Sequence, residues 1–153
     1  MTPAVISLGS NVGDRMVYLA LAVSILEPYA ISPVYETEPV GGPEQGDFLN
    51  AVVLCDLDAA HAWQRAQVAE QRARRARDVR WGPRTLDVDV IWASGRAADL
   101  LLPHPRAAER AFVLAPWADV VPDAVLPGHG RVKDLLTVLD VSGIRRRDDL
   151  VLS

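Results

Sequence analysis

Two carboxylates separated by one residue, Asp87 and Asp89, are the first candidates for chemistry in this sequence of 153 residues. They alternate with the apolar residues Leu86, Val88 and Val90, which is the pattern of a half-buried β-strand. On such a strand both carboxylates project from one face, ~6–7 Å apart. Two close carboxylates repel each other unless a cation lies between them, and oxygen ligands suit Mg²⁺. The pair therefore indicates either a metal site or two side chains that simply face water.

Arginines crowd into the segment immediately before this pair. They are Arg72, Arg74, Arg75, Arg77, Arg80 and Arg84. Carboxylates for a metal, beside guanidinium groups for oxygen atoms, are what a polyphosphate–Mg²⁺ complex requires. A solvated basic loop is the simpler interpretation, and we favour it for Arg72 and Arg74. Trp81 among the arginines also fits base stacking in an RNA-binding module, although the paired acids would repel a nucleic-acid backbone unless metal bound.

A histidine between two prolines, His104, is the next candidate. Pro103 and Pro105 stiffen the backbone and make the direction of the imidazole predictable. Arg110 and Phe112 follow shortly after. If a helix starts near His104, its positive N-terminal end provides a natural phosphate site. The alternative is a surface histidine with no role.

Aromatic and amide side chains offer a site for a flat ligand. Phe48 and Asn50 alternate on one strand face, and Trp81 precedes a rigid Gly-Pro turn. Two aromatic rings can sandwich a heterocycle, while an amide pairs with its donor and acceptor edge. Phe48 and Phe112 as plain core residues remain the alternative.

The sequence lacks a Walker A motif. The turn from Gly9 to Asp14 has two glycines but neither the required spacing nor a lysine, so any nucleotide site is of another kind. Lys133 is the only lysine. Phosphate binding would therefore depend on arginine side chains and backbone N–H groups.

Composition predicts one cytoplasmic globular domain over residues 1–153. The net charge of −4 provides no global attraction for nucleic acid. No apolar run approaches the roughly 18–20 residues needed to span a bilayer, and the N-terminus has no secretory signal. A single cysteine, Cys55, falls in a strand-like run and is expected to be a buried, unreactive thiol rather than a nucleophile. We expect a monomer.

Hydrophobic periodicity indicates mixed strands and helices. Strands are expected over Ala4–Leu8, Ile31–Glu38, Phe48–Leu57 and Thr85–Trp92. Helices are expected from Asp14 to about Pro28 and over Asp58–Arg72, Ala107–Ala115 and Val132–Leu139. Without strict β-α-β alternation, this order predicts an α+β sandwich with a mainly antiparallel sheet.

Finer features of these elements are also predicted. Pro33 suggests that its strand is an edge, whereas the nearly all-apolar strand from Phe48 should be central. Residues 39–47 and 73–83 are rich in glycine, proline or arginine, and we interpret them as loops. The tail, residues 142–153, is either a solvated terminus or a short edge strand.

Several segments together resemble the 6-hydroxymethyl-7,8-dihydropterin pyrophosphokinase family. The most specific is the run from Arg80 to Val90, RWGPRTLDVDV. Further matches are Leu8-Gly9-Ser10-Asn11, Ser32-Pro33-Val34-Tyr35-Glu36-Thr37, Phe48-Leu49-Asn50-Ala51, Pro103-His104-Pro105-Arg106 and Glu109-Arg110-Ala111-Phe112. They occur in the family's order from Leu8 to about Leu126.

The resemblance implies a ferredoxin-like, three-layer α/β/α sandwich with a mainly antiparallel central sheet. It also implies an enzyme that transfers pyrophosphate from ATP to the pterin hydroxymethyl group in folate synthesis, with AMP as the second product. Asp87 and Asp89 would hold two Mg²⁺ ions. The partners would be small molecules, with neither nucleic acid nor membrane.

The remaining site residues are likewise implied by the resemblance. Around the pterin they are Thr37, Glu38, Val40, Phe48, Asn50, Trp81 and Phe112. Near ATP they are Gln67, Glu70, Arg77, Arg84, His104 and Arg110. Catalytic contacts with the phosphates are implied for Arg75, Arg77, Arg84, His104 and Arg110.

The chain departs from the family pattern at three positions. Arg74 stands where many members carry glycine. Because arginine has less backbone freedom than glycine, this replacement would stiffen the following loop. Leu101 replaces a frequent threonine, so one polar contact to ATP would be missing. Phe48 replaces a frequent tyrosine, which keeps stacking but removes a hydroxyl.

Overall fold

The computed structural model describes residues 3–38, 46–75, 85–97 and 99–153. Within these ranges a six-stranded sheet has the order β5-β1-β4-β3-β8, with β2 also paired to β4. The strands are β1 (Pro3–Ser10), β2 (Ala30–Ile31), β3 (Tyr35–Thr37), β4 (Phe48–Asp56), β5 (Asp87–Trp92) and β8 (Ile144–Arg146). All of these pairings are antiparallel, which confirms the predicted α+β class.

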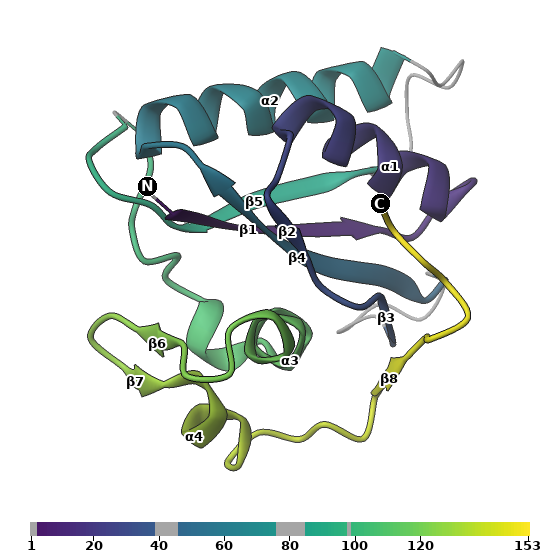
Figure 1. The fold of residues 1–153 in the computed structure, drawn as a ribbon. Coiled ribbons are helices and arrows are strands. Elements are labelled where there is room, and N and C mark those ends of the chain that lie inside the picture. The colour runs from purple at the N-terminus through teal and green to yellow at the C-terminus, as the bar shows by residue number, and fades with distance from the viewer. Residues whose placement is uncertain (1–2, 39–45, 76–84, 98) are drawn as a thin grey trace.

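Helices cover both faces of this sheet and make three layers (Figure 1). On one face lie α1 (Arg15–Leu26) and α2 (Ala59–Arg75). On the other lie α3 (Ala111–Val120), α4 (Val132–Leu136) and a hairpin of β6 (Val125–Leu126) and β7 (Gly130–Arg131). A 3₁₀ turn, η1 (Ala107–Glu109), leads into α3. None of the described helices is long and apolar enough to cross a membrane.

The core beneath α1 and α2 follows from their sequences. The carboxylate of Asp14 accepts a hydrogen bond from the Val17 N–H, 3.3 Å away, and so caps α1 as predicted. The buried face of α2 consists of alanines: Ala59, Ala62, Ala66, Ala69 and Ala73. Because these side chains are small, the α2 backbone lies close to its neighbours.

Strand alternation divides the sheet between two cores. In β4, Ala51, Val53 and Cys55 belong to the core under α1 and α2, whereas Val52 and Leu54 belong to the core under α3. Both faces of β4 are therefore covered, which confirms the predicted central strand. Burial raises the pKa of the Cys55 thiol to about 11, so this group stays protonated at neutral pH.

The strand predicted over 31–38 is interrupted, and the prediction of an edge is confirmed only for its first part. Among the described strands β2 pairs with β4 alone, whereas β3 has neighbours on both sides. Ser32 donates its backbone N–H to the Val52 carbonyl at 2.9 Å, and its hydroxyl accepts the Val52 N–H at 2.8 Å. The hydroxyl thus takes the place of a backbone acceptor, and Pro33 follows without an N–H. The chain resumes pairing as β3, which β8 covers on its outer side.

Several helix boundaries also differ from the prediction. The α2 helix continues to Arg75, so the start of the predicted 73–83 loop is helical. The segment 107–115 is not one helix, because η1 ends before α3 begins and α3 runs on to Val120. The last helix ends at Leu136, although Leu139 still packs against the core under α3.

The tail resolves in favour of an edge strand. Residues Tyr35, Glu36 and Thr37 of β3 pair with Arg146, Arg145 and Ile144 of β8. Beyond β8 the chain returns toward α1 (Figure 1), and Leu152 is buried in the core under α1 and α2.

Candidate active site

A cavity of about 360 Å³ opens on the face of the sheet that carries α3. Its lining comes from four strands and from the start of α3. The lining residues are Ser7, Gly9, Thr37, Glu38, Phe48, Asn50, Asp87, Asp89, Arg110 and Phe112.

Strand alternation explains why polar groups meet here. In β5, Asp87 and Asp89 share a face with Ile91, which is buried in the core under α3. In β4, Asn50 shares that face with Val52 in the same way. Each strand is thus apolar beneath α3 and polar beyond it.

The two carboxylates lie on β5, beside β1, which also contributes to the cavity lining. Asp87 pairs with Gly9 and Asp89 with Ser7 across the β1–β5 ladder. Both acids are half-buried, whereas Val88 and Val90 on the opposite face are buried. The common face predicted from the sequence is therefore present.

The chemistry of this pair fits Mg²⁺. The described residues contain no cluster of three or more histidine, cysteine, aspartate or glutamate side chains able to hold a metal. Mg²⁺ is commonly bound by one or two carboxylates, its other positions being filled by water and phosphate. Asp87 and Asp89, accessible from a cavity, provide that kind of donor set.

Arg110 lies opposite the carboxylates. It is the residue that precedes α3, and its Nη1 is 3.7 Å from Oδ2 of Asp89. Its guanidinium carbon is 5.6 Å from the centre of the Phe112 ring, within the range of a cation–π contact. Arg110 therefore spans the distance between the acids and the aromatic wall.

His104 is not among the residues that line the cavity, but its backbone is bonded to β5, the strand that carries both acids. Its N–H donates to the Ile91 carbonyl at 2.8 Å, and its Nδ1 accepts the Arg106 N–H at 3.1 Å. With Nδ1 an acceptor, the neutral ring carries its proton on Nε2. Burial lowers the pKa of His104, opposed by Asp89 and reinforced by Arg110 and Arg106. The imidazole is neutral at pH 7 and offers one N–H donor.

The opposite end of the cavity is built for a flat ligand with polar edges. Asn50 is 3% exposed, and its Nδ2 donates to Oγ1 of Thr37 at 2.7 Å. A Cβ on Gly9 would meet Oδ1 of Asn50 at 3.0 Å and the Phe48 ring at 3.7 Å. The missing side chain at Gly9 thus keeps the floor open beneath the amide.

Sequence reasoning missed two lining residues, Ser7 and Gly9. The glycine spacing from Gly9 to Asp14 predicts a turn, but Gly9 belongs to β1. The alternation Val5, Ser7, Gly9 was the available signal, since it passes from apolar to small residues along one face.

The predicted site residues do not all meet in this cavity. Gln67 and Arg75 are exposed on α2 and do not line it. Glu70 instead accepts the backbone N–H of Val88 at 2.9 Å. Val40, Arg77, Trp81 and Arg84 lie outside the described residues.

Comparison with known proteins decides the family. Residues 5–122 match the family of 7,8-dihydro-6-hydroxymethylpterin-pyrophosphokinases. The chain belongs to this family. Similar proteins named 2-amino-4-hydroxy-6-hydroxymethyldihydropteridine pyrophosphokinase support the same family assignment. That of Mycobacterium leprae is 48% identical over 151 residues, covering 87% of this chain and 79% of the relative. The relative from Methylorubrum extorquens is 41% identical over 157 residues, covering 95% of this chain and 99% of the relative.

Solved structures support the pyrophosphokinase fold. A wild-type HPPK-DHPS of Plasmodium falciparum has a TM-score of 0.65 at 12% identity, over 89% of this chain and 43% of that one. An HPPK-DHPS in complex with substrates has a TM-score of 0.68 at 10% identity, over 95% and 46%. This chain spans less than half of those chains. The likeness confirms the ferredoxin-like α+β sandwich.

All three departures from the pyrophosphokinase pattern lie within the described residues, and Phe48 lines the cavity. Arg74 is exposed in the last turn of α2, so it continues a helix where glycine would tend to end one. Leu101 is 71% exposed and does not line the cavity.

Proposed function

We propose that this chain transfers pyrophosphate from ATP to the hydroxymethyl group of 6-hydroxymethyl-7,8-dihydropterin, giving AMP and the pterin pyrophosphate in folate biosynthesis. One observation carries the proposal. In a member of this family, two carboxylates on one strand face a cavity that also contains two aromatic rings and a buried amide. Metal-bound phosphates and a flat, polar-edged acceptor would meet there.

The pterin is recognised by the end of the cavity away from the acids. Phe48 and Phe112 would stack against the ring, since both line the cavity from different elements. The fixed amide of Asn50 keeps Oδ1 on the open side at Gly9, where it can accept a pterin N–H. Thr37 and Glu38 border the same edge, and we assign Val40 and Trp81 to it by family position.

The metal site is assigned to Asp87 and Asp89, which would hold two Mg²⁺ ions. Bound Mg²⁺ neutralises phosphate charge and lowers the pKa of a coordinated hydroxyl. The two carboxylates hold this charge at one end of the cavity. The stacking residues orient the acceptor at the other end.

The phosphates are received by charged and polar donors around the acids. Nε2–H of neutral His104 would donate to a phosphate oxygen, and Arg110 would move from Asp89 to a second oxygen, because its 3.7 Å contact is loose. By family position we add Arg75, Arg77 and Arg84 as phosphate contacts, and Gln67 and Glu70 on the ATP side. The exposed position of Arg75 requires closure over the ligand.

The reaction is an in-line substitution at the β-phosphorus of ATP. The hydroxymethyl oxygen forms a bond to that phosphorus, and the bond from phosphorus to the oxygen bridging the α- and β-phosphates breaks. The electron pair remains on the departing oxygen of AMP, and the hydroxyl proton passes to solvent. Two phosphoryl groups thus move as one unit, with no covalent bond to the protein.

We further propose that residues 1–153 act as one cytoplasmic domain and as a monomer. The two cores share a single sheet, which favours one folding unit. A lone, buried cysteine suits a reducing compartment.

The test of this function is ATP consumption with and without the pterin. We expect AMP only when 6-hydroxymethyl-7,8-dihydropterin and Mg²⁺ are both present. Formation of ADP, or AMP release that ignores the pterin, would contradict the proposal. Single-stranded RNA binding without pterin turnover would instead identify a nucleic-acid module, and pterin binding without turnover would identify a binding protein.

A further inference from the structure

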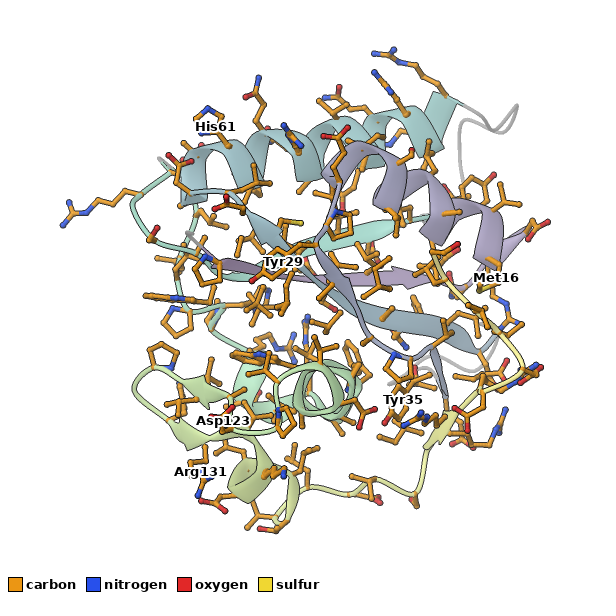
Figure 2. All side chains as sticks on the ribbon, viewed as in Figure 1. Met16, Tyr29, Tyr35, His61, Asp123 and Arg131 are labelled. Atoms are coloured by element: carbon orange, nitrogen blue, oxygen red, sulfur yellow. The ribbon has the colours of Figure 1, made fainter. Side chains whose placement is uncertain are left out.

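The three consecutive arginines of the tail point alternately to the two faces of the sheet. Arg145 and Arg147 contact Glu36 on the face that carries α1, at 2.5 and 2.9 Å. Arg146, between them, contacts Asp119 of α3 at 3.7 Å, and Tyr35 donates its hydroxyl to the same carboxylate. Alternation in a strand explains the motif. Figure 2 shows Tyr35 on β3, next to β8.

Glu36 is the centre of the cluster on the α1 face. It is 8% exposed, and its carboxylate also accepts from Nη1 of Arg15 at 2.9 Å. The same Nη1 donates to the carbonyl of Asp47 at 2.9 Å, just before β4 begins. Glu36 thus ties β3 to α1, to the start of β4 and to the tail.

This cluster adjoins the pterin edge of the cavity along β3. Thr37, the next residue, pairs with Phe48 on one side and with Ile144 on the other. Glu38 donates its backbone N–H to the Gly143 carbonyl at 3.0 Å. The two residues that border the pterin edge are therefore each held by β8 or by the residue before it.

The tail also forms a wall of the adjoining space. A second cavity of about 580 Å³ shares Thr37, Glu38, Arg110 and Phe112 with the first, and its lining includes the tail residues Ser142, Gly143 and Ile144. These three residues lie beyond the residues 5–122 that match the family. The outer support of the pterin edge is therefore supplied by a part of the chain outside the matched family region.

We infer that Arg145 and Arg147 are positioning residues that hold Thr37 and Glu38 in place for the pterin, acting through Glu36. The inference rests on the proposed function, because it assumes that the ligand at this edge is the pterin. Asp87 and Asp89 lie on β5, and Arg110 lies just before α3, so these three residues are outside this cluster. Loss of the arginines should therefore weaken pterin binding while ATP binding stays unchanged.

The test compares Arg147→Gln with Arg131→Gln. Arg131 is an exposed residue of the β6–β7 hairpin, on a different part of the molecule from Tyr35 and β8 (Figure 2), so it controls for the loss of one charge. For each protein we would measure KM for pterin and for ATP, kcat, the Kd of the pterin in the presence of a non-hydrolysable ATP analogue, and Tm.

For Arg147→Gln we expect KM and Kd for the pterin to rise roughly 10-fold, as is usual when a supporting partner of a ligand contact is lost. KM for ATP should stay within about 2-fold of the wild-type value, because the arginines are expected to affect only the binding of the pterin. Arg147→Lys keeps the charge but not the forked donors, so it should recover part of the affinity. Arg131→Gln should match the wild type.

Two results would overturn the inference. One is a lower Tm for Arg147→Gln with unchanged pterin KM and Kd, which would make the arginines purely structural. The other is an equal rise in KM for both substrates. Should Arg147→Gln not fold, Arg145→Gln, whose side chain is 57% exposed, replaces it with the same expected split. If the wild type neither binds nor converts the pterin, the proposed function itself is wrong. If the wild type is active and only the expected split between pterin and ATP is missing, the inference alone is wrong.

Discussion

The carboxylate of Glu70 accepts the backbone N–H of Val88 at 2.9 Å, the one residue that stands between Asp87 and Asp89. Among the described strands β5 lies at the end of the sheet, so its outward N–H groups have no neighbouring strand to accept them. Glu70 therefore acts from α2 as a substitute for that strand. It fixes the backbone that carries the two acids.

Replacement of Glu70 by alanine should both destabilise the fold and weaken the metal site. Leaving the Val88 N–H unpaired costs about 1–3 kcal/mol, and a looser strand should raise the Mg²⁺ concentration needed for half-maximal turnover. Glu70→Gln retains an acceptor oxygen and should recover most of both properties. Gln71→Ala, at an exposed neighbouring position, is the control. An Mg²⁺ dependence unchanged in Glu70→Ala would remove this positioning role.

Asp87→Asn and Asp89→Asn should each lower kcat by roughly 10³-fold, because several kcal/mol of charge stabilisation in the transition state would be lost. Tm should change by only about 2 °C, since neither side chain is buried in either core. Asp123→Asn, at an exposed turn, should leave turnover unchanged. Near-normal rates in either active-site variant would refute the metal assignment.

The Glu36 cluster predicts a specific dependence of stability on pH. Arg15, and then Arg145 and Arg147, outweigh the cost of burial and hold the pKa of Glu36 at about 2, below its usual 4.5. A lowered folded-state pKa stabilises the fold fully above the unfolded-state value and loses this contribution as pH falls through the folded-state value. The stabilisation should therefore be complete above about pH 5 and should fade between about pH 4.5 and 2.

Denaturant unfolding of the wild type and of Glu36→Gln across this range measures the effect. The variant should be less stable by about 2 kcal/mol at pH 7, and the difference should shrink toward pH 2. Asp47 and Asp149 share Arg145 and Arg147 with Glu36, so the difference reports on Glu36 together with these partners. A gap that stays constant with pH would show that the charge of Glu36 does not stabilise the fold.

Gly9→Ala should impair pterin binding selectively. The added Cβ would lie 3.0 Å from Oδ1 of Asn50, so the amide must shift from the position fixed by Thr37. We expect KM for the pterin to rise roughly 10-fold, with Tm lowered by a few degrees at most. Asp123→Asn, at an exposed turn far from these residues in the sequence, is the control and should leave KM for the pterin unchanged. Equal KM values in the two variants would show that Gly9 does not shape the cavity.

Local patterns in the sequence predicted much of the site. The alternation from Leu86 to Val90 placed both acids on one face, and the same rule paired Phe48 with Asn50. The helix start considered near His104 is only the short turn η1, and the backbone N–H of His104 is bonded to the Ile91 carbonyl of β5.

Contacts between distant segments could not be predicted in this way. Arg145 and Glu36 are 109 residues apart, and nothing in either segment alone indicates that the tail returns beside β3. The role of Glu70 depends equally on α2 lying along β5. Such pairings follow from the three-dimensional arrangement of the sheet, so the tail could be described only as a solvated terminus or an edge strand.

³¹P NMR of the complete reaction follows the β- and γ-phosphorus atoms of ATP and so tests the transfer of pyrophosphate most directly. With ATP, Mg²⁺ and 6-hydroxymethyl-7,8-dihydropterin, the β- and γ-phosphorus signals of ATP should reappear as a diphosphate ester on the pterin, with AMP formed in equal amount. Asp89→Asn should slow this conversion by roughly 10³-fold. Appearance of ADP with a pterin monophosphate, or of ADP with inorganic phosphate, would contradict the account.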